Sequence, residues 1–193
     1  ASGRLVIGLP PSVGRSLSGV LVRAFRERFP AATLSVVEGL SHYTMEWLAI
    51  GRVDCAVVYN VAPSAAVDLL PVLDEPLYLV SARPRAGGRL IGAPIRLAEV
   101  AERELVIPSR PHSVRMLLEA ALAAQGRRAL VALEIESVPA MLELVRNDAL
   151  HAVLARNALK SSGSEDAFRA RPIIEPELKT TLWIATSAQR PRG

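Results

Sequence analysis

Apolar residues along the chain alternate between short continuous runs and stripes with the spacing of a helix face. In the first part of the chain, three runs predict strands over residues 4–9, 33–38 and 54–59. A helix stripe lies between the first two runs: Leu17, Val20, Leu21, Ala24 and Phe25. Met45 and Leu48 mark a second helix that ends near Gly51. This β-α-β-α-β order predicts parallel strands joined by right-handed crossovers.

The second half of the chain repeats this order. Strands are predicted over residues 104–107, 130–135 and 151–154, and helices over 114–122 and 138–145. Between the two halves, an extended stretch over 69–81 is interrupted by Pro71 and Pro76. After the polar segment 160–166, residues 181–185 supply one more strand. A duplicated unit with a late return strand predicts two lobes with two crossings between them.

We therefore expect an α/β fold of two Rossmann-like lobes joined by two crossover segments. The predicted boundaries place residues 1–79 and 166–193 in lobe I and residues 80–165 in lobe II. Ligands of open α/β sheets bind beyond the carboxyl ends of the strands. Two lobes that face each other would therefore form a ligand site in the cleft between them.

The composition agrees with a folded domain, since 50% of the residues are hydrophobic and 22% are charged. Aromatic residues make up only 4%, so the core must be aliphatic, as in buried parallel strands. Cys55 is the one cysteine, which excludes an intramolecular disulfide and a multi-cysteine metal site. Because Cys55 lies in an apolar run, we interpret it as a small core residue. A reducing cytoplasm suits such a chain.

The net charge of +4 and the pI of about 9.8 raise the question of nucleic-acid binding. The basic residues are dispersed, however, and those outside the predicted elements include Arg83, Arg85, Arg89, Arg190 and Arg192. No helix rich in lysine and arginine carries the aromatic residues that stack on bases. We therefore expect no direct DNA contact by this segment. No apolar stretch approaches the roughly 20 residues of a membrane span, so no membrane partner is expected.

Candidate catalytic residues are few. The histidines are His42, His112 and His151, and no HExxH, GxSxG or close cluster of His, Asp and Glu occurs. A distant Ser–His–Asp arrangement remains open, but a solvated or capping role is favoured for each histidine. No glycine-rich nucleotide motif follows a strand. We expect no enzyme activity, no cofactor and no metal site.

A serine recurs at each predicted turn from strand to helix: Ser12, Ser41, Ser109 and Ser137. One interpretation is helix capping, in which the side-chain oxygen accepts a hydrogen bond from the first turn. The other is a ligand site, since four helix starts at one cleft would offer free N–H groups and partial positive charge to a small anion. Arg110 and His112 flank Pro111 at the third turn and would add a formal charge. An exposed position on the rim is equally open for Arg110.

Several segments together resemble the effector-binding domain of LysR-type bacterial transcription regulators. They are Gly3–Gly8, Leu21–Pro30 with Thr33–Val36, Glu38–Ser41, Glu46–Asp54, Glu75–Val80 and Val106–Arg110, in that order. No single segment is diagnostic, but the similarity covers essentially the whole chain. Within the family, Val37–Ser41 and Pro108–His112 are most similar to the branch of nitrogen-assimilation control regulators.

The resemblance implies a type II periplasmic-binding-protein fold, a small-molecule effector in the interlobe cleft and no catalysis. It implies a winged helix-turn-helix ahead of residue 1, through which alone the parent protein would contact DNA, and a homodimer or homotetramer in the cytoplasm. The effector contacts of the family fall on Ser12, Val13, Ser41, Ser109, Arg110, Ser137 and Val138, to which the charge argument adds His112. In place of the family's glycine-rich turn near residue 151, this chain has Arg146–His151. The alternatives are a transport-associated solute-binding protein and an enzyme on the same scaffold.

Overall fold

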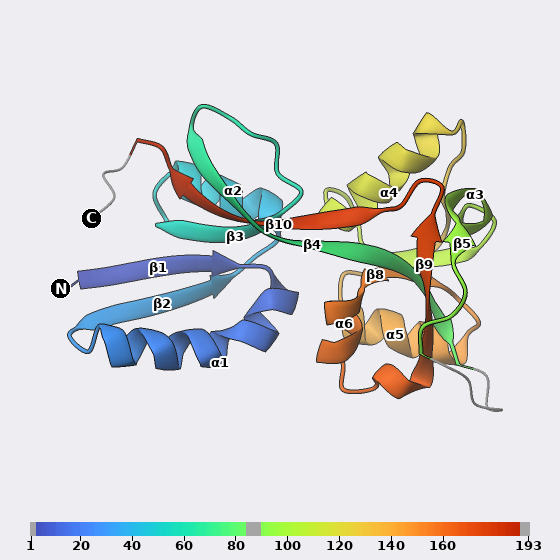
Figure 1. Cartoon of the computed structure of the whole chain (residues 1–193), viewed down its shortest axis with the longest axis horizontal. Helices are drawn as coiled ribbons and strands as arrows, with labels where there is room; N and C mark the ends of the chain where they lie inside the picture. Colours follow the sequence, from blue (N-terminus) through green and yellow to red (C-terminus); the bar gives the residue numbers. More distant parts are fainter. Residues whose placement is uncertain (1–2, 84–89, 190–193) are drawn as a thin grey trace. The chain divides into compact units, whose positions relative to one another are not determined.

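The computed structural model describes residues 3–83 and 90–189, so Arg85, Arg89, Arg190 and Arg192 lie outside the described residues. The chain forms two compact units, and the second comprises Asp74–Thr180. Two strands pass from one unit to the other, β4 (Val67–Ala82) and β10 (Lys179–Ser187) (Figure 1). The boundaries differ from the predicted ones chiefly at the second crossing, because residues 166–180 group with the second unit instead of the first.

The first unit has the predicted order of elements. They are β1 (Gly3–Leu9), α1 (Pro11–Arg28), β2 (Ala32–Glu38), α2 (Ser41–Ala49) and β3 (Cys55–Tyr59). Strand β1 pairs in parallel with both β2 and β3, which confirms the predicted parallel β-α-β-α-β arrangement. Strand β10 then pairs antiparallel with β3. The carboxyl ends of β1, β2 and β3 therefore lie at one edge of the sheet, next to the starts of α1 and α2.

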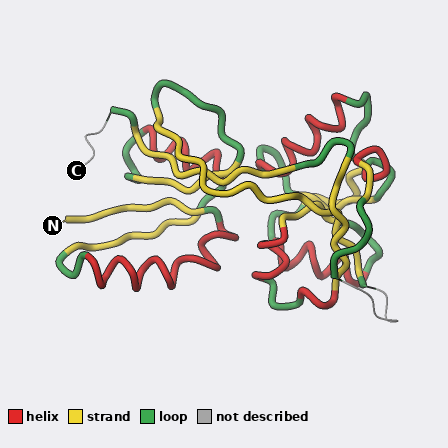
Figure 2. Tube along the Cα trace, in the orientation of Figure 1, coloured by secondary structure: helices red, strands yellow, loops and turns green. Residues whose placement is uncertain are grey.

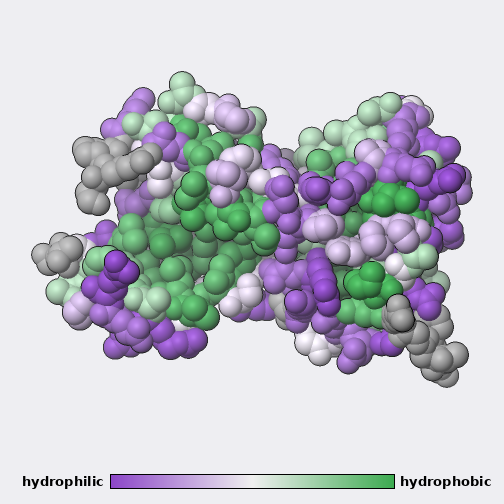
Figure 3. Space-filling model, in the orientation of Figure 1, coloured by the Kyte–Doolittle hydropathy of each residue, from purple (hydrophilic) through white to green (hydrophobic). Residues whose placement is uncertain are grey.

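The two faces of this sheet are covered unequally. Helix α2 covers a core of fully buried residues that includes Leu48, Val53 and Val58. On the α1 side, the buried hydrophobic cluster consists of Leu9, Val13 and Leu182, and the apolar neighbours of this cluster on the strands are only half-buried. Figure 3 shows apolar surface gathered over the first unit where Figure 1 draws β1 and β3.

The second unit is built around β4 and β9 (Figure 2). Its further elements are β5 (Ile95–Arg96), α3 (Leu97–Val100), β6 (Glu104–Ile107), α4 (Ser113–Ala124), β7 (Leu130–Glu134), α5 (Val138–Asn147), β8 (Ala152–Ala155), α6 (Arg156–Ser161), a 3-10 turn (Glu165–Ala167) and β9 (Phe168–Ile174). Strand β4 pairs antiparallel with β8 and β9, while β5 pairs in parallel with β9. Strands β6 and β7 form a separate parallel pair, and a parallel bridge joins Leu105 to His151.

Strand β9 is the main element that the apolar pattern did not predict. Its buried residues Phe168 and Ala170 alternate with Arg169 and Arg171, and Pro172 interrupts the run. Pairing with β4 and β5 assigns it to the second unit, which is why the predicted boundary at residue 165 fails. The stretch predicted to be interrupted at Pro71 and Pro76 is instead one continuous strand, β4.

The core of the second unit is aliphatic, as predicted, with Phe168 as its one buried aromatic residue among those described. Cys55 lies in β3 of the first unit, and burial raises the pKa of its thiol, which fits a core residue and not a nucleophile. Among the described helices, none has the length and apolar character needed to cross a membrane. The described residues contain no group of three or more His, Cys, Asp or Glu side chains able to hold a metal ion.

Candidate functional site

In the first unit, Ser12 lies inside α1 and does not cap it. The N-cap is Pro10, which makes no side-chain cap, and the Ser12 carbonyl accepts a hydrogen bond from the Ser16 hydroxyl at 3.2 Å. The side chain of Val13 is 2% exposed and packs in the core with Leu9 and Leu182. Only the backbone of Val13 is therefore left to contact a ligand. The helical hydrogen bonds begin with Gly14 N–H, so the N–H groups of Ser12 and Val13 have no partner within the helix.

Ser41 is the first residue of α2 and connects this helix to the end of β3. Its hydroxyl accepts a hydrogen bond from the Tyr59 backbone N–H at 2.9 Å, and its side chain is almost fully buried. The N-cap of α2 is Leu40, whose carbonyl accepts from the buried Thr44 hydroxyl at 2.9 Å. Capping therefore does not explain Ser41. Among the described residues, no acceptor for the Ser41 hydroxyl proton is found.

In the second unit, only one of the two predicted serines caps a helix. Ser137 is the N-cap of α5, and its hydroxyl accepts from Ala140 N–H at 3.5 Å. Ser109 lies in the loop before α4, three residues ahead of the N-cap, which is His112. His112 accepts at Nδ1 from Val114 N–H at 3.3 Å, so this histidine is a helix cap. Val138 opens α5 and is partly buried in the core.

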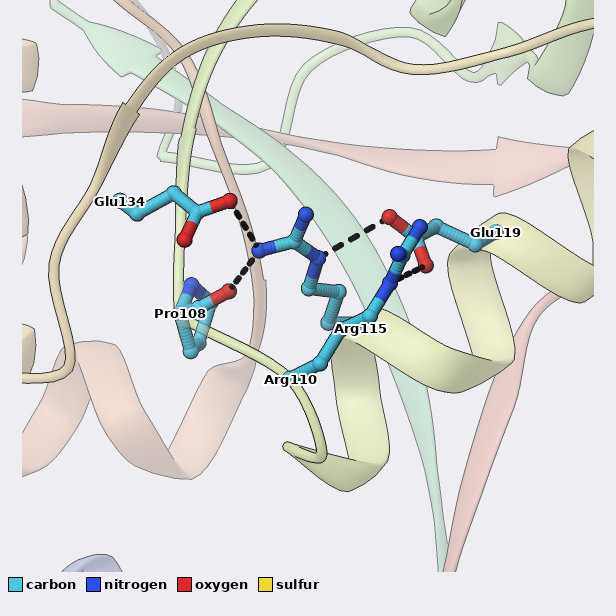
Figure 4. A network of polar contacts seen from close by, with 5 residues as sticks. All are labelled: Pro108, Arg110, Arg115, Glu119 and Glu134. Atoms are coloured by element: carbon cyan, nitrogen blue, oxygen red, sulfur yellow. Dashed lines mark hydrogen bonds and ion pairs between the residues drawn. The ribbon is translucent and has the colours of Figure 1, made fainter.

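A network of charged side chains holds the turn that carries Ser109 (Figure 4). Arg115 on α4 is 6% exposed and is the central residue of this network. It donates to Glu134 at 2.7 Å, to Glu119 at 2.9 Å and to the carbonyl of Pro108 at 2.9 Å. Because Pro108 follows β6 and Glu134 ends β7, Arg115 ties together the two strand ends that lead into α4 and α5.

Arg110 occupies the outer end of the same network. Its Nε donates to Glu119 Oε2 at 2.8 Å, and its side chain is 64% exposed. The side chain therefore turns toward α4, as Figure 4 shows, and in this structure its charge is paired with a carboxylate. Of the two interpretations left open for Arg110, the exposed position is the one observed here.

The charges of the network stabilise one another. The hydrogen bond from Arg110, together with that from Arg115, lowers the pKa of Glu119. The pKa of Glu134 is lowered by its hydrogen bond with Arg115 and also by one from the Ser109 hydroxyl. Burial opposes the charge of Arg115, but the hydrogen bonds with Glu134 and Glu119 outweigh it and raise the pKa of the guanidinium. All four groups are therefore ionised at neutral pH.

Comparison with known proteins identifies the family of this chain. The LysR substrate binding domain family matches residues 1–193, which is the whole chain. This chain belongs to that family. It is 28% identical over 189 residues to the nitrogen assimilation regulatory protein of Klebsiella aerogenes, covering 97% of this chain and 60% of the relative. The resemblance to LysR-type regulators is confirmed. The chain spans about 60% of the length of the nitrogen assimilation regulatory proteins that it matches.

Solved structures show the same fold. The QuiR effector-binding domain in complex with shikimate has a TM-score of 0.82 at 19% identity, with 100% of this chain and 91% of that chain covered. The regulatory domain of Synechocystis PCC6803 CcmR in complex with 2-PG has a TM-score of 0.83 at 18% identity, with the same coverage. The predicted α/β class with the type II periplasmic-binding-protein fold is confirmed.

Three members of the network in this LysR domain were not predicted from the sequence: Arg115, Glu119 and Glu134. One signal was present, because Arg115 lies three and seven residues before Leu118 and Leu122, on the buried stripe of the predicted helix. A charged residue on such a stripe needs a buried partner. Glu119, four residues further on the same helix, is one such partner. The pairing with Glu134 depends on β7 lying beside β6, which sequence spacing does not give.

The other residues of interest lie apart from these turns. His42 is exposed and pairs with Glu46 at 3.2 Å, while His151 joins the backbones of β6 and β8. A pocket of about 170 Å³ in the second unit is lined by Pro139, Leu142, Glu143, Arg146, Ser162, Ser164 and Phe168, none of them a predicted effector contact. At the departure from the family's glycine-rich turn, Ala149 takes a φ of 55°, the left-handed conformation that glycine favours.

Proposed function

We propose that this LysR domain senses a small organic anion and passes its presence to the rest of a transcription regulator. The observation that carries the proposal is the match of the whole chain to the family. Two structures of the same fold were solved with small molecules, namely QuiR with shikimate and CcmR with 2-PG. Shikimate is a carboxylate, which is the chemistry that helix starts and arginine side chains recognise.

The proposed contacts are those predicted from the sequence: Ser12, Val13, Ser41, Ser109, Arg110, His112, Ser137 and Val138. They divide by chemistry. Val13 and Val138 would contribute backbone N–H groups, because their side chains are buried or partly buried. Ser12 and Ser41 would contribute hydroxyl protons, and Arg110 would contribute charge. Binding of one ligand by both lobes stays a prediction.

Thermal unfolding tests the proposal. Carboxylates at millimolar concentration, shikimate among them, should raise the Tm of the domain above its value in sodium chloride of equal ionic strength. A ligand that binds the folded state at a hundred times its Kd stabilises it by about 2.7 kcal/mol. The increase should be lost in a variant with Ser12→Ala and Ser137→Ala together. If none of the carboxylates tested raises the Tm above its value in the sodium chloride control, the sensing proposal is wrong.

We also propose that the parent protein binds DNA through a winged helix-turn-helix ahead of residue 1, acts in the cytoplasm and catalyses no reaction. The support is that the chain spans about 60% of relatives that are regulatory proteins. The gene should encode about 90 further residues upstream, the size of a small DNA-binding domain with its linker. An upstream signal peptide in their place would favour the solute-binding alternative.

We also propose that the domain self-associates as a homodimer or homotetramer. Helix α1 exposes Leu17, Val20 and Val22, and α4 exposes small residues that include Ala120. A two-fold arrangement would use each contact twice. Sedimentation velocity at micromolar concentration should show a dimer, and Val22→Glu or Ala120→Glu should weaken it. The exposed substitution Arg128→Glu is the control for added negative charge. A monomer at every concentration would refute the dimer.

A further inference from the structure

Arg110 and Arg115 contact the same carboxylate but differ in how firmly each is held. Arg115 is buried and has three acceptors on three different segments: α4, β7 and the loop after β6. Arg110 is 64% exposed, and within the described chain its one hydrogen-bond acceptor is Glu119. Moving Arg115 would leave a buried charge without partners, whereas moving Arg110 transfers an exposed guanidinium to water.

Glu119 is arranged so that the loss of Arg110 does not leave it unpaired. Its Oε2 accepts from Arg110 at 2.8 Å, while its Oε1 accepts from Arg115 at 2.9 Å. When Arg110 turns away, the carboxylate keeps its ion pair with Arg115 and gains access to water on the other oxygen. An exposed ion pair of this kind is worth little, so its exchange for another anion has a small cost.

We propose that Glu119 is an internal competitor for Arg110, and that an anionic effector binds at the turn between β6 and α4 by replacing it. In the ligand-free state the charge of Arg110 is matched by Glu119. An arriving carboxylate takes over Arg110, while Arg115 keeps the turn in place through Pro108 and Glu134. This inference rests on the proposed function. It adds Glu119 as the residue that sets how strongly an anion must bind Arg110 to replace it.

The exchange has a consequence for specificity. To replace Glu119, an anion must interact with the Arg110 guanidinium more strongly than Glu119 does. A carboxylate meets this condition because it can accept two parallel N–H bonds from one guanidinium, and chloride does not. Glu119 therefore selects for carboxylates against simple halides, although both are attracted by a free arginine. In this structure Glu119 accepts one hydrogen bond from Arg110, donated by Nε, and so does not form the two-bond arrangement.

The wild-type domain can be tested directly by NMR. The Nε–H signal of Arg110, assigned by its loss in Arg110→Lys, is followed during titration with citrate alongside the backbone amides of Ser109 and Val138. The exchange predicts that the Arg110 signal moves saturably with the same Kd as the amides, and that sodium chloride of equal ionic strength does not reproduce the shift. If the amides shift and the Arg110 signal stays, the exchange is refuted while anion binding stands. If neither shifts, citrate does not bind at the turn, and the inference fails together with its premise.

Two variants separate competition from general electrostatics. Glu119→Gln should tighten citrate binding about two- to fivefold, the range that an exposed ion pair is worth. In an Arg110→Gln background the same substitution should have no effect. Glu134→Gln removes a carboxylate that does not contact Arg110, and any effect it has should persist in that background. Equal tightening by Glu119→Gln with and without Arg110 would overturn the proposal. The wild-type titration uses a variant only to assign the Arg110 signal, so misfolding of Glu119→Gln or Glu134→Gln leaves that test intact.

Discussion

The starts of α1 and α4 occupy the same place in the two units, after the first strand of a β-α-β segment, but they are built differently. The turn before α1 is closed by packing, because Val13 is buried and a Cβ added to Gly14 would collide with the Glu38 side chain. The turn before α4 is closed by polar contacts, because His112 caps the helix and the ion pairs of Arg110 and the buried Arg115 hold the loop. The same topology is therefore held by packing at the helix start in one unit and by a network of paired charges in the other.

Removing the buried charge should have the largest effect on this difference. Arg115→Met leaves Glu119, Glu134 and the Pro108 carbonyl without their shared donor, and breaking a buried pair of this kind costs several kcal/mol. Because Glu134 is half-exposed, we expect a loss of about 2–4 kcal/mol in the free energy of unfolding, measured by urea denaturation.

Arg128→Met is the matched control for this loss, since Arg128 is exposed and forms no ion pair within 4 Å with another described residue. Its unfolding midpoint should stay at the wild-type value. A stability of Arg115→Met equal to that of the control would show that charge does not hold the turn before α4.

Mild acid should affect the second unit more than the first. Burial lowers the pKa of His112, and burial with the nearby charge of Arg103 lowers that of His151, whose Nδ1 is buried without a hydrogen-bond partner among the described residues. The unfolded chain takes up these protons near pH 6.5, before the folded chain does. The contribution of these two neutral histidines to the free energy of unfolding is therefore fully present above pH 6.5. It falls as the pH drops toward their lowered pKa values, by at most about 1.4 kcal/mol per pH unit for each histidine.

Urea denaturation at pH 7.5 and 5.5 checks this dependence. His112→Gln and His151→Gln together should flatten it. Equal pH slopes in the double variant and the wild type would assign the dependence to other groups.

Helix capping should give the smallest difference between the units. Ser137→Ala removes the cap of α5 and should cost about 0.5 kcal/mol, the low end for a cap, because the hydrogen bond is long. Ser12→Ala removes no cap and should leave the free energy of unfolding unchanged. Thermal unfolding of the two single variants side by side measures this, and an equal loss in both would contradict the assignment of the caps.

Elements marked by a run of apolar residues were predictable from the sequence. Elements whose stability comes from contacts with distant segments were less so. Apolar runs located β1, β2, β3 and β6 because the strands of a parallel sheet that is covered by helices are rich in apolar residues. Strand β9 escaped because Arg169, Arg171 and Pro172 interrupt its pattern, and its stability comes from pairing with β4 and β5.

The site shows the same division. The four serines were placed correctly near helix starts, but their partners were not predictable. The Ser41 hydroxyl accepts from the Tyr59 N–H, which lies in a different element of the first unit. A hydrogen bond from the Ser109 hydroxyl lowers the pKa of Glu134. These contacts join residues that are distant in sequence, as do those between Arg115 and Glu134, so no local pattern reports them.

A crystal structure of the domain grown with citrate would show directly where an anion binds. We expect a carboxylate at the starts of α4 and α5, within hydrogen-bond distance of a backbone N–H there, with Arg110 turned from Glu119 toward the ligand. Citrate found only on outer surfaces, with Arg110 still paired to Glu119 and the turns at Ser12, Ser41, Ser109 and Ser137 free of anions, would contradict it.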